Sequence, residues 1–270
     1  MESRNQLSLP SLAELGKDLL TLSPAEAAVA LCRPLACFLL FWPFALAHHY
    51  LLAAVSAAGL LFFAYTSASH DLVHRTLRLP ILLNEFLLSA LEAICLRSGH
   101  AFRLTHLQHH KRFPHDDDIE AVDAAKGFWH ALACGPPHQL RLFFWAWLRG
   151  SPTERRWMFW ESAFCLAILI ASVCYYRSFP ALLFYVLSVT FGSWLYPLAT
   201  VWWPHRAEGL TVLQQTRAFR GRLVPFLFFQ HTYQLEHHLY PGVSSVRWHD
   251  LGQRLEPYLR QAGVEFVQLP

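Results

Sequence analysis

Two long stretches without a charged side chain place the strongest constraint on how this chain can fold. Residues 50–69 and 180–203 contain no Asp, Glu, Lys or Arg. Each stretch is long enough to cross a hydrocarbon core of ~30 Å, which takes ~20 helical residues. Helices are expected because a spanning segment must satisfy its own backbone hydrogen bonds in lipid. Over all 270 residues, 54% are hydrophobic and only 15% charged, against roughly a quarter in soluble domains. The sequence therefore predicts an all-α integral membrane protein.

Each uncharged stretch has an apolar partner just before it in the chain. Residues 25–47 follow a helix-opening Ser23-Pro24 pair, and residues 157–176 are apolar apart from Glu161. Only short turns separate the members of each pair. We therefore expect four transmembrane helices arranged as two hairpins, with both ends of each hairpin on the same side of the membrane.

The other segments predict interfacial helices and a polar cap. Residues 81–96 are apolar except for a polar stripe, and residues 129–149 are rich in aromatic side chains and broken at 135–137. We predict one domain over residues 1–270. It consists of a polar segment (1–24), a first hairpin (25–69), a loop (70–156), a second hairpin (157–203) and a tail (204–270).

Charge places the loop and the tail on the cytoplasmic side. Most Lys and Arg residues lie in these two segments, whereas the short opposite turns carry only Arg177. The positive-inside rule therefore predicts a cytoplasmic cap. The net charge of +3 and the lack of a Lys/Arg-rich run give no reason to expect nucleic acid as a partner. The six cysteines form no CxxC pair and indicate buried apolar residues rather than disulfides or zinc ligands.

Three histidine motifs lie in the loop and the tail. They are His70-x-x-x-His74, His106-x-x-His109-His110 and Gln234-x-x-His237-His238, and His205 follows directly after the last predicted span. Spacings of three and four residues bring imidazoles onto one face of a helix, and neutral imidazole is the commonest transition-metal ligand in proteins. We therefore predict a metal site built from these motifs.

The number of imidazoles predicts more than one metal. A single zinc site takes only three or four protein ligands, and a thiol-free, imidazole-rich set suits iron and O2 chemistry better than structural zinc. No HExxH motif is present, which argues against a membrane metalloprotease. A metal transporter is a further alternative. It would need ionisable ligands inside its spans, and the two best spans contain neither charge nor histidine.

The three motifs, in this order between paired hairpins, resemble the histidine boxes of the integral-membrane fatty acid desaturase and hydroxylase superfamily. The resemblance covers roughly residues 69–243. It implies an O2-dependent oxidoreductase with a di-iron centre on the cytoplasmic face, acting on unactivated C–H bonds of a membrane lipid. It also implies the iron ligands His70, His74, His106, His109, His110, His205, His237 and His238.

The third motif differs from the common HxxHH pattern because Gln234 occupies its first position. The run from Tyr233 to Pro241 is similar to the third box of front-end acyl desaturases, where Gln stands there too. Gln234 could bind iron through its carbonyl, hold a bound water, or only hydrogen-bond. His231, one helical turn earlier, could substitute for it. An inactive scaffold that has kept the motifs is a further alternative.

Two substrate classes remain open. The third motif favours fatty acyl desaturation. The Thr105–His110 motif, the following acidic run and the Trp203–Arg206 motif are similar to bacterial-type carotenoid ring hydroxylases. No His-Pro-Gly-Gly signature of a fused haem domain is present. We therefore expect a separate electron donor, either a ferredoxin or a cytochrome-type protein.

Carboxylates are expected to orient metal-bound imidazoles through hydrogen bonds. Asp71 and Glu236 lie inside the motifs, and Asp117 represents the acidic run 116–118, most of which we expect to be solvated. We expect Phe62, Phe63, Trp194 and Tyr196 either to line a substrate tunnel or to pack in the core or against lipid. The two histidines at positions 48 and 49 are expected on the opposite membrane face. The remaining ones are expected at the surface or interface, namely His100, His115, His130, His138 and His249.

Overall fold

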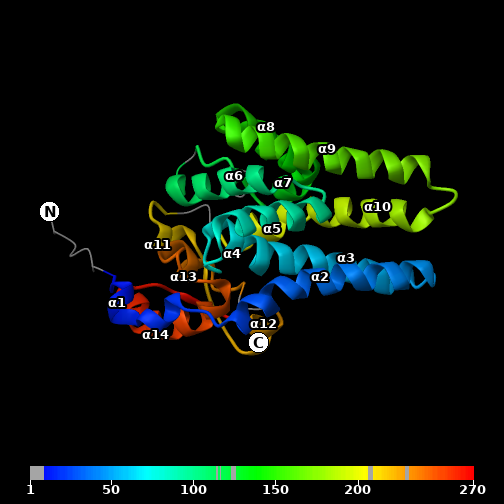
Figure 1. Cartoon of the computed structure of the whole chain (residues 1–270). Helices are drawn as coiled ribbons and strands as arrows, with labels where there is room; N and C mark the ends of the chain where they lie inside the picture. Colours follow the sequence, from blue (N-terminus) through cyan, green and yellow to red (C-terminus); the bar gives the residue numbers. More distant parts are fainter. Residues whose placement is uncertain (1–8, 114, 116, 123–125, 206–208, 229–230) are drawn as a thin grey trace.

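Four long apolar helices form the main body of the computed structural model, which describes residues 9–113, 115, 117–122, 126–205, 209–228 and 231–270. The first hairpin consists of α2 (Pro24–Leu46) and α3 (Tyr50–Phe63), and the second of α9 (Pro152–Cys174) and α10 (Pro180–Trp194). In Figure 1 both hairpin turns point to the right, and the other segments gather at the opposite end. Four continuous segments are long and apolar enough to cross a membrane, namely Pro24–Leu46, Tyr50–His74, Pro152–Cys174 and Pro180–Trp202. The predicted all-α fold with four spans is confirmed.

Local sequence signals define where these helices begin. Ser23 and Ser151 each form a capping box with the Glu three residues later, and a proline occupies the first helical position after each serine. The serine hydroxyl satisfies a backbone N–H that has no partner within the helix. The predicted helix opening at Ser23-Pro24 is therefore confirmed.

The second and fourth spans each contain a π-helical segment near the histidine end. Segment η2 (Ala64–Ala68) leads into α4 (Ser69–His74), and η4 (Pro197–Trp202) ends three residues before His205. Thr66 and Thr200 lie in these segments, and each donates its hydroxyl to a backbone carbonyl four residues earlier, at 2.7 and 2.8 Å. Wider π turns occur often at functional sites, and here each one precedes a histidine-bearing segment.

Apolar packing joins the two hairpins. Phe41 of α2, Leu60 of α3 and Tyr185 of α10 belong to one buried cluster, and the rings of Phe41 and Tyr185 lie 4.9 Å apart. Side chains on the outer faces are far more exposed, for example Leu51, with 78% of its surface accessible. Large exposed apolar faces on long helices are expected of a protein surrounded by lipid.

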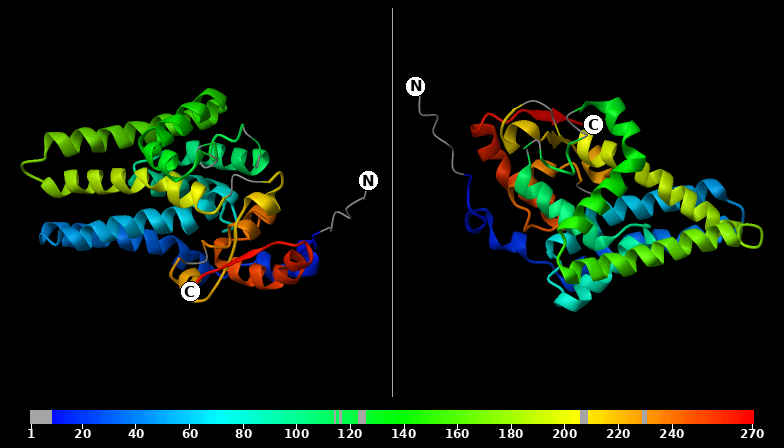
Figure 2. Two further views of the ribbon diagram at one scale, coloured as in Figure 1. Left: turned by 180° about the vertical axis from the view of Figure 1, so that it is seen from behind. Right: turned by 90° about the horizontal axis from the view of Figure 1, so that it is seen from above.

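Shorter helices cover the histidine end of the second hairpin. They are α5 (Ile81–Ile94), α6 (Gly99–Arg112), α7 (Phe128–Ala133) and α8 (Gly135–Arg149). The two views of Figure 2 place α6 and α8 beside the ends of the long helices. The polar stripe of α5 faces the protein, since Asn84 and Glu92 are buried whereas Leu82 and Phe86 are exposed. The stripe therefore serves contacts between helices.

The tail folds against the beginning of the chain. It contains α11 (Val212–Gln215), β1 (Ala218–Arg220), α12 (Leu223–Leu227), α13 (Gln234–Leu239), the 3₁₀ turn η5 (Ser245–Arg247), α14 (Trp248–Gln261) and β2 (Phe266–Gln268). Strands β1 and β2 pair in parallel, with Phe219 opposite Val267. The tail packs its apolar side chains against Leu15 of α1 (Leu12–Leu15) and Leu19 of η1 (Lys17–Leu20). This second core holds α13 in place.

Candidate metal centre

Eight imidazoles from four separate segments meet at the histidine end of the long helices. They form two groups in which the possible ligand atoms lie within 4.8 Å of one another. One group contains His70, His74, His106, His110 and His237, and the other contains His109, His205 and His238. Helix α6 contributes to both groups, since His106 and His110 belong to the first and His109 belongs to the second.

In the five-imidazole group, four rings direct Nε2 toward one another. The Nε2 atom of His70 lies 3.0 Å from that of His237 and 3.2 Å from that of His106. His110 Nε2 lies 2.8 Å from His237 Nε2 and 3.2 Å from His106 Nε2. The buried Nε2 of His74 has no hydrogen-bond partner among the described residues. Nitrogens that converge in this way, one of them without a hydrogen-bond partner, suit a shared cation.

The three-imidazole group is built around the side chain of Phe113. Nε2 of His205 lies 3.1 Å from Nε2 of His238, and the ring of His109 lies 4.9 Å from that of His238. The ring of Phe113 lies between 4.6 and 5.1 Å from all three imidazoles. This group therefore has an apolar wall and three nitrogen donors.

Acceptors on the far side of three rings determine which nitrogen carries the proton. His109 Nδ1 lies 2.5 Å from Asp118, His106 Nδ1 lies 3.1 Å from Glu120, and His205 Nδ1 lies 2.7 Å from the carbonyl oxygen of Val201. An ionised carboxylate or a carbonyl can only accept, so each Nδ1 must donate. Each neutral ring then presents an unprotonated Nε2, which is the form that binds a metal.

Burial favours neutral rings in most of the cluster. Desolvation, together with the neighbouring His109, lowers the pKa of His205 to about 3. Desolvation and the surrounding imidazoles also hold the pKa values of His110, His237 and His238 well below the usual range. His109 differs, because Asp118 outweighs desolvation and raises its pKa. Mostly neutral, buried imidazoles are ready to bind a cation without first losing a proton.

Gln234 and His231 lie next to each other beside these groups. Gln234 Nε2 lies 3.0 Å from His231 Nδ1, and both side chains are buried. The two residues therefore form a pair with each other. His231 is not among the imidazoles that meet within 4.8 Å in the described part of the chain.

The carboxylates predicted to orient the imidazoles need correction. Asp71 accepts hydrogen bonds from Thr76, Ser244 and Ser245, and so joins α4 to η5. Glu236 lies 2.7 Å from Nη2 of Arg220, joining α13 to β1.

Asp117 is exposed and pairs with Arg112 instead of an imidazole. Its neighbour Asp118 and the more distant Glu120 make the contacts expected of it. Burial alone would raise the pKa of Glu120, but the imidazoles of His106, His109 and His138 outweigh it and lower the pKa to about 2. Asp116 and Arg206 lie outside the described residues. The position of Asp118 in the acidic run was the only local signal for this role, and nothing local marked Glu120.

Two of the isolated histidines lie in the interior, contrary to expectation. His100 and His138 are buried. The Nδ1 of His100 lies 2.7 Å from Glu161, and its Nε2 lies 3.0 Å from Glu85. His100 is thus part of a polar network that joins α5, α6 and α9. His115 is exposed, His130 and His249 are partly exposed, and His48 and His49 lie at the first hairpin turn, as expected.

A cavity of about 320 Å³ lies between the second and fourth spans, and we call it the inter-span cavity. Its walls are mainly apolar, and Tyr65, Tyr196 and His231 bring it toward the imidazoles. The rings of Tyr65 and Tyr196 lie 4.3 Å apart, and the Tyr196 hydroxyl donates to Glu120 at 3.2 Å. Phe62 also lines this cavity, whereas Phe63 and Trp194 are not among its lining residues.

These features define a multi-pass membrane protein with an imidazole-rich cluster beside an apolar cavity. A family model described as fatty acid desaturase matches residues 40–270, which include all eight clustered histidines. The chain therefore belongs to the fatty acid desaturase family and is a lipid oxidoreductase of the desaturase or hydroxylase type. No curated protein sequence matches the chain.

Proposed function

We propose that this protein is an O2-dependent di-iron oxidoreductase that desaturates a fatty acyl chain. The observation that carries the proposal is the division of eight imidazoles into groups of five and three. Each group would hold one iron ion. Three of the rings are held by acceptors at Nδ1, which leaves Nε2 of each neutral ring free for a metal ion.

Iron would supply the O2-derived oxidising power that removal of hydrogen from an unactivated C–H bond requires. The residues of the chain would hold the ions and position the substrate. Asp118 and Glu120 would keep His109 and His106 in the metal-binding tautomer. Trp248, whose ring lies 5.2 Å from His70 and 4.9 Å from His237, would close the five-imidazole group on its outer side.

The inter-span cavity would take the apolar chain of the substrate. Small residues line this cavity where the second and fourth spans approach each other. A Cβ atom at Gly192 would lie 2.3 Å from Leu61 Cδ1, so the absence of a side chain there keeps α10 near α3. Tyr65 and His231 line the same cavity. That end of the cavity also contains Tyr196, whose hydroxyl donates to Glu120, the carboxylate that contacts His106.

Gln234 would act by holding His231 or a water molecule, since its side chain pairs with His231. We further propose that the histidine end faces the cytoplasm, because most Lys and Arg residues lie in the segments gathered there. A separate ferredoxin or cytochrome-type protein would then deliver electrons from that side.

The test is product analysis in two expression hosts with metal analysis of the purified protein. One host makes β-carotene, and the other makes only saturated and monounsaturated acyl chains. The His238→Ala variant is the inactive control. New double bonds in acyl chains, together with about two iron ions per chain, are the expected result.

Hydroxylated carotenoid with unchanged acyl chains would instead assign the chain to ring hydroxylation. Protein without iron would overturn the di-iron proposal. Iron without either product would point to a different substrate or to a host that lacks the electron donor.

A further inference from the structure

Arg97 is a buried cation at the wall of the inter-span cavity, and no sequence motif marked it. It follows α5 in a tight turn where Leu96 has a φ of 56°, a left-handed conformation that is unfavourable for a bulky residue. Arg97 N donates to the backbone oxygen of Glu92 at 2.9 Å, which closes this turn. The turn directs the Arg97 side chain inward, where it is buried. Strain of this kind is retained where the placement of a side chain matters.

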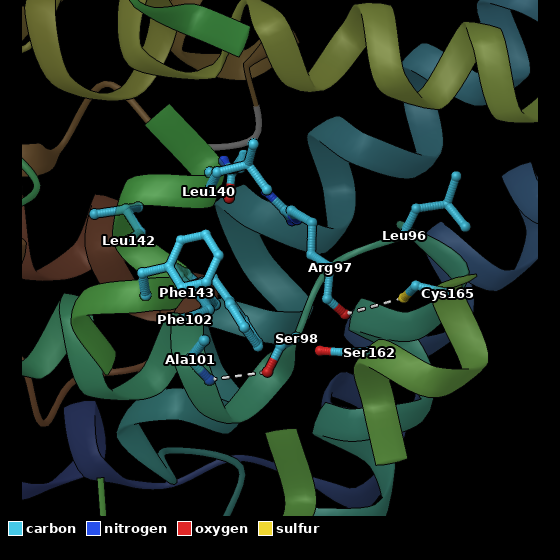
Figure 3. Close-up of a pocket in the computed structure, with 12 residues that line it drawn as sticks. Leu96, Arg97, Ser98, Ala101, Phe102, Leu140, Leu142, Phe143, Ser162 and Cys165 are labelled. Carbon is cyan, nitrogen blue, oxygen red and sulfur yellow. Dashed lines mark hydrogen bonds between the residues drawn. The ribbon is translucent and has the colours of Figure 1, made fainter. Parts of the chain in front are cut away.

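Two cavities share Arg97 as a lining residue. Arg97 lines the inter-span cavity and also a smaller cavity of about 280 Å³ between α6, α8 and α9, which we call the α8 pocket. Figure 3 shows the Arg97 side chain beside Leu140 in the α8 pocket, with its carbonyl oxygen accepting from Cys165 Sγ. The surrounding side chains are mostly apolar in both cavities. A charged group in such a setting needs compensation.

Glu92 supplies the compensating charge along one edge of the guanidinium. Its carboxylate lies 2.9 Å from Nε and 3.1 Å from Nη2 of Arg97, and both side chains are buried. Burial opposes the charged form, but Glu92 outweighs it and raises the pKa of Arg97 above its usual range. As an ion pair, Arg97 and Glu92 carry no net charge. Hydrogen-bonding capacity remains on the guanidinium, which has five N–H donors.

The pair also lies close to the metal cluster. The Arg97 guanidinium carbon is 5.3 Å from the ring centre of Tyr196, whose hydroxyl donates to Glu120. Glu120 in turn contacts His106. One aromatic ring and one carboxylate thus separate Arg97 from the five-imidazole group. A substrate atom bound to Arg97 would be near the carbon that reacts.

We propose that Arg97 binds a neutral oxygen acceptor of the substrate, such as a hydroxyl, keto or ester oxygen, close to the reacting carbon. This inference rests on the proposed function in treating the inter-span cavity as the substrate site. A carboxylate is a poorer fit because Glu92 already neutralises Arg97 and Glu120 adds a second negative charge nearby. A third anion in this low-dielectric setting would be unpaired. A pure hydrocarbon would offer no acceptor to the guanidinium N–H groups that do not face Glu92.

A competition assay on purified protein in lipid nanodiscs tests this without requiring turnover. Palmityl alcohol carrying a diazirine beside its hydroxyl is photo-crosslinked, and the label is mapped by mass spectrometry. Unlabelled palmityl alcohol, methyl palmitate, palmitate and hexadecane compete. We expect the label on residues 58–66 and 192–203. The two neutral oxygenated competitors should be effective at concentrations about tenfold lower than the other two, as expected for one hydrogen bond to a charged group. Zeaxanthin and β-carotene are then used as competitors in the same way, to compare a ring that carries oxygen with one that does not.

The double variant Glu92→Gln/Arg97→Gln should remove this preference, because it replaces the ion pair by neutral amides of similar size. The matched control is Glu85→Gln/Arg103→Gln, which neutralises an ion pair that lines neither cavity and should keep the preference. Equal competition by hexadecane, strongest competition by palmitate, or labelling confined to the α8 pocket would each overturn the proposal. If the double variant does not fold, the competition among the four lipids in the unsubstituted protein still tests the proposal. This assay measures lipid binding, whereas the di-iron proposal is tested by iron content and product analysis. The two proposals can therefore fail independently.

Discussion

Replacement of Asp118 by Asn should weaken metal binding at the three-imidazole group specifically. Asp118 Oδ1 accepts from the backbone N–H of Glu120 at 3.0 Å, while Oδ2 contacts His109 Nδ1 at 2.5 Å. In the variant, the amide oxygen would keep the backbone N–H, which places the NH2 group against His109. His109 Nδ1 would then have to accept, its proton would move to Nε2, and the metal-binding lone pair would be lost.

The expected loss follows from the role of such carboxylates. Removing the hydrogen-bond partner of a metal-bound imidazole typically lowers metal affinity 10–100-fold, or about 1.4 to 2.7 kcal/mol. Only one of the two proposed iron sites should be affected, because Asp118 contacts none of the five-imidazole group. The matched control is Asp117→Asn, one residue earlier, where the side chain is exposed and pairs with Arg112.

The assay is iron content after dialysis against chelators of increasing affinity. We expect the Asp118→Asn protein to lose about one of its two iron ions to a chelator that leaves both in the unsubstituted protein and in the Asp117→Asn control. The reasoning about the tautomer would be refuted if the Asp118→Asn protein resisted the chelators equally well, or if the Asp117→Asn protein behaved like it.

Three further predictions address the cluster and its support. Gln234→Ala should retain both iron ions and lose only part of the activity. Loss of one iron ion in this variant would show that Gln234 binds iron directly or holds a water molecule that does. Glu236→Gln should destabilise the fold by about 1 to 3 kcal/mol, because it removes the more deeply buried of the two carboxylates that pair with Arg220 and leaves only Glu256; thermal unfolding measures this, and a near-neutral shift would contradict it. Metal-free protein should lose stability as the pH falls below about 6.5 toward 3. The pKa of His205 is about 3 in the folded protein and about 6.5 in the unfolded chain, so over this range the unfolded chain binds a proton that the folded protein does not. Unfolding midpoints that do not change between pH 7.5 and pH 5 would rule out this contribution.

Local sequence was sufficient for the parts of this protein that depend on residues close together in the chain. Uncharged stretches of about 20 residues predict membrane-spanning helices, because only a helix satisfies the backbone hydrogen bonds of a single segment in lipid. The four long helices confirm this prediction. Spacings of three and four residues determine which imidazoles share a helix face, so the convergence of the histidine motifs could be anticipated. The resemblance of these motifs also led to the correct family.

Tertiary structure decided how these parts are combined. The division of eight imidazoles into five and three depends on how α4, α6, α13 and His205 pack, and no local spacing carries that information. Asp71 and Glu236 were expected to contact imidazoles because they are neighbours in sequence, yet helical geometry turns them toward η5 and β1. Glu120 and Arg97 reach the site from irregular segments, whose paths depend on long-range packing rather than on periodicity. Sequence therefore determined the membrane-spanning helices and the chemistry of the donors, whereas packing between distant segments determined which donors meet.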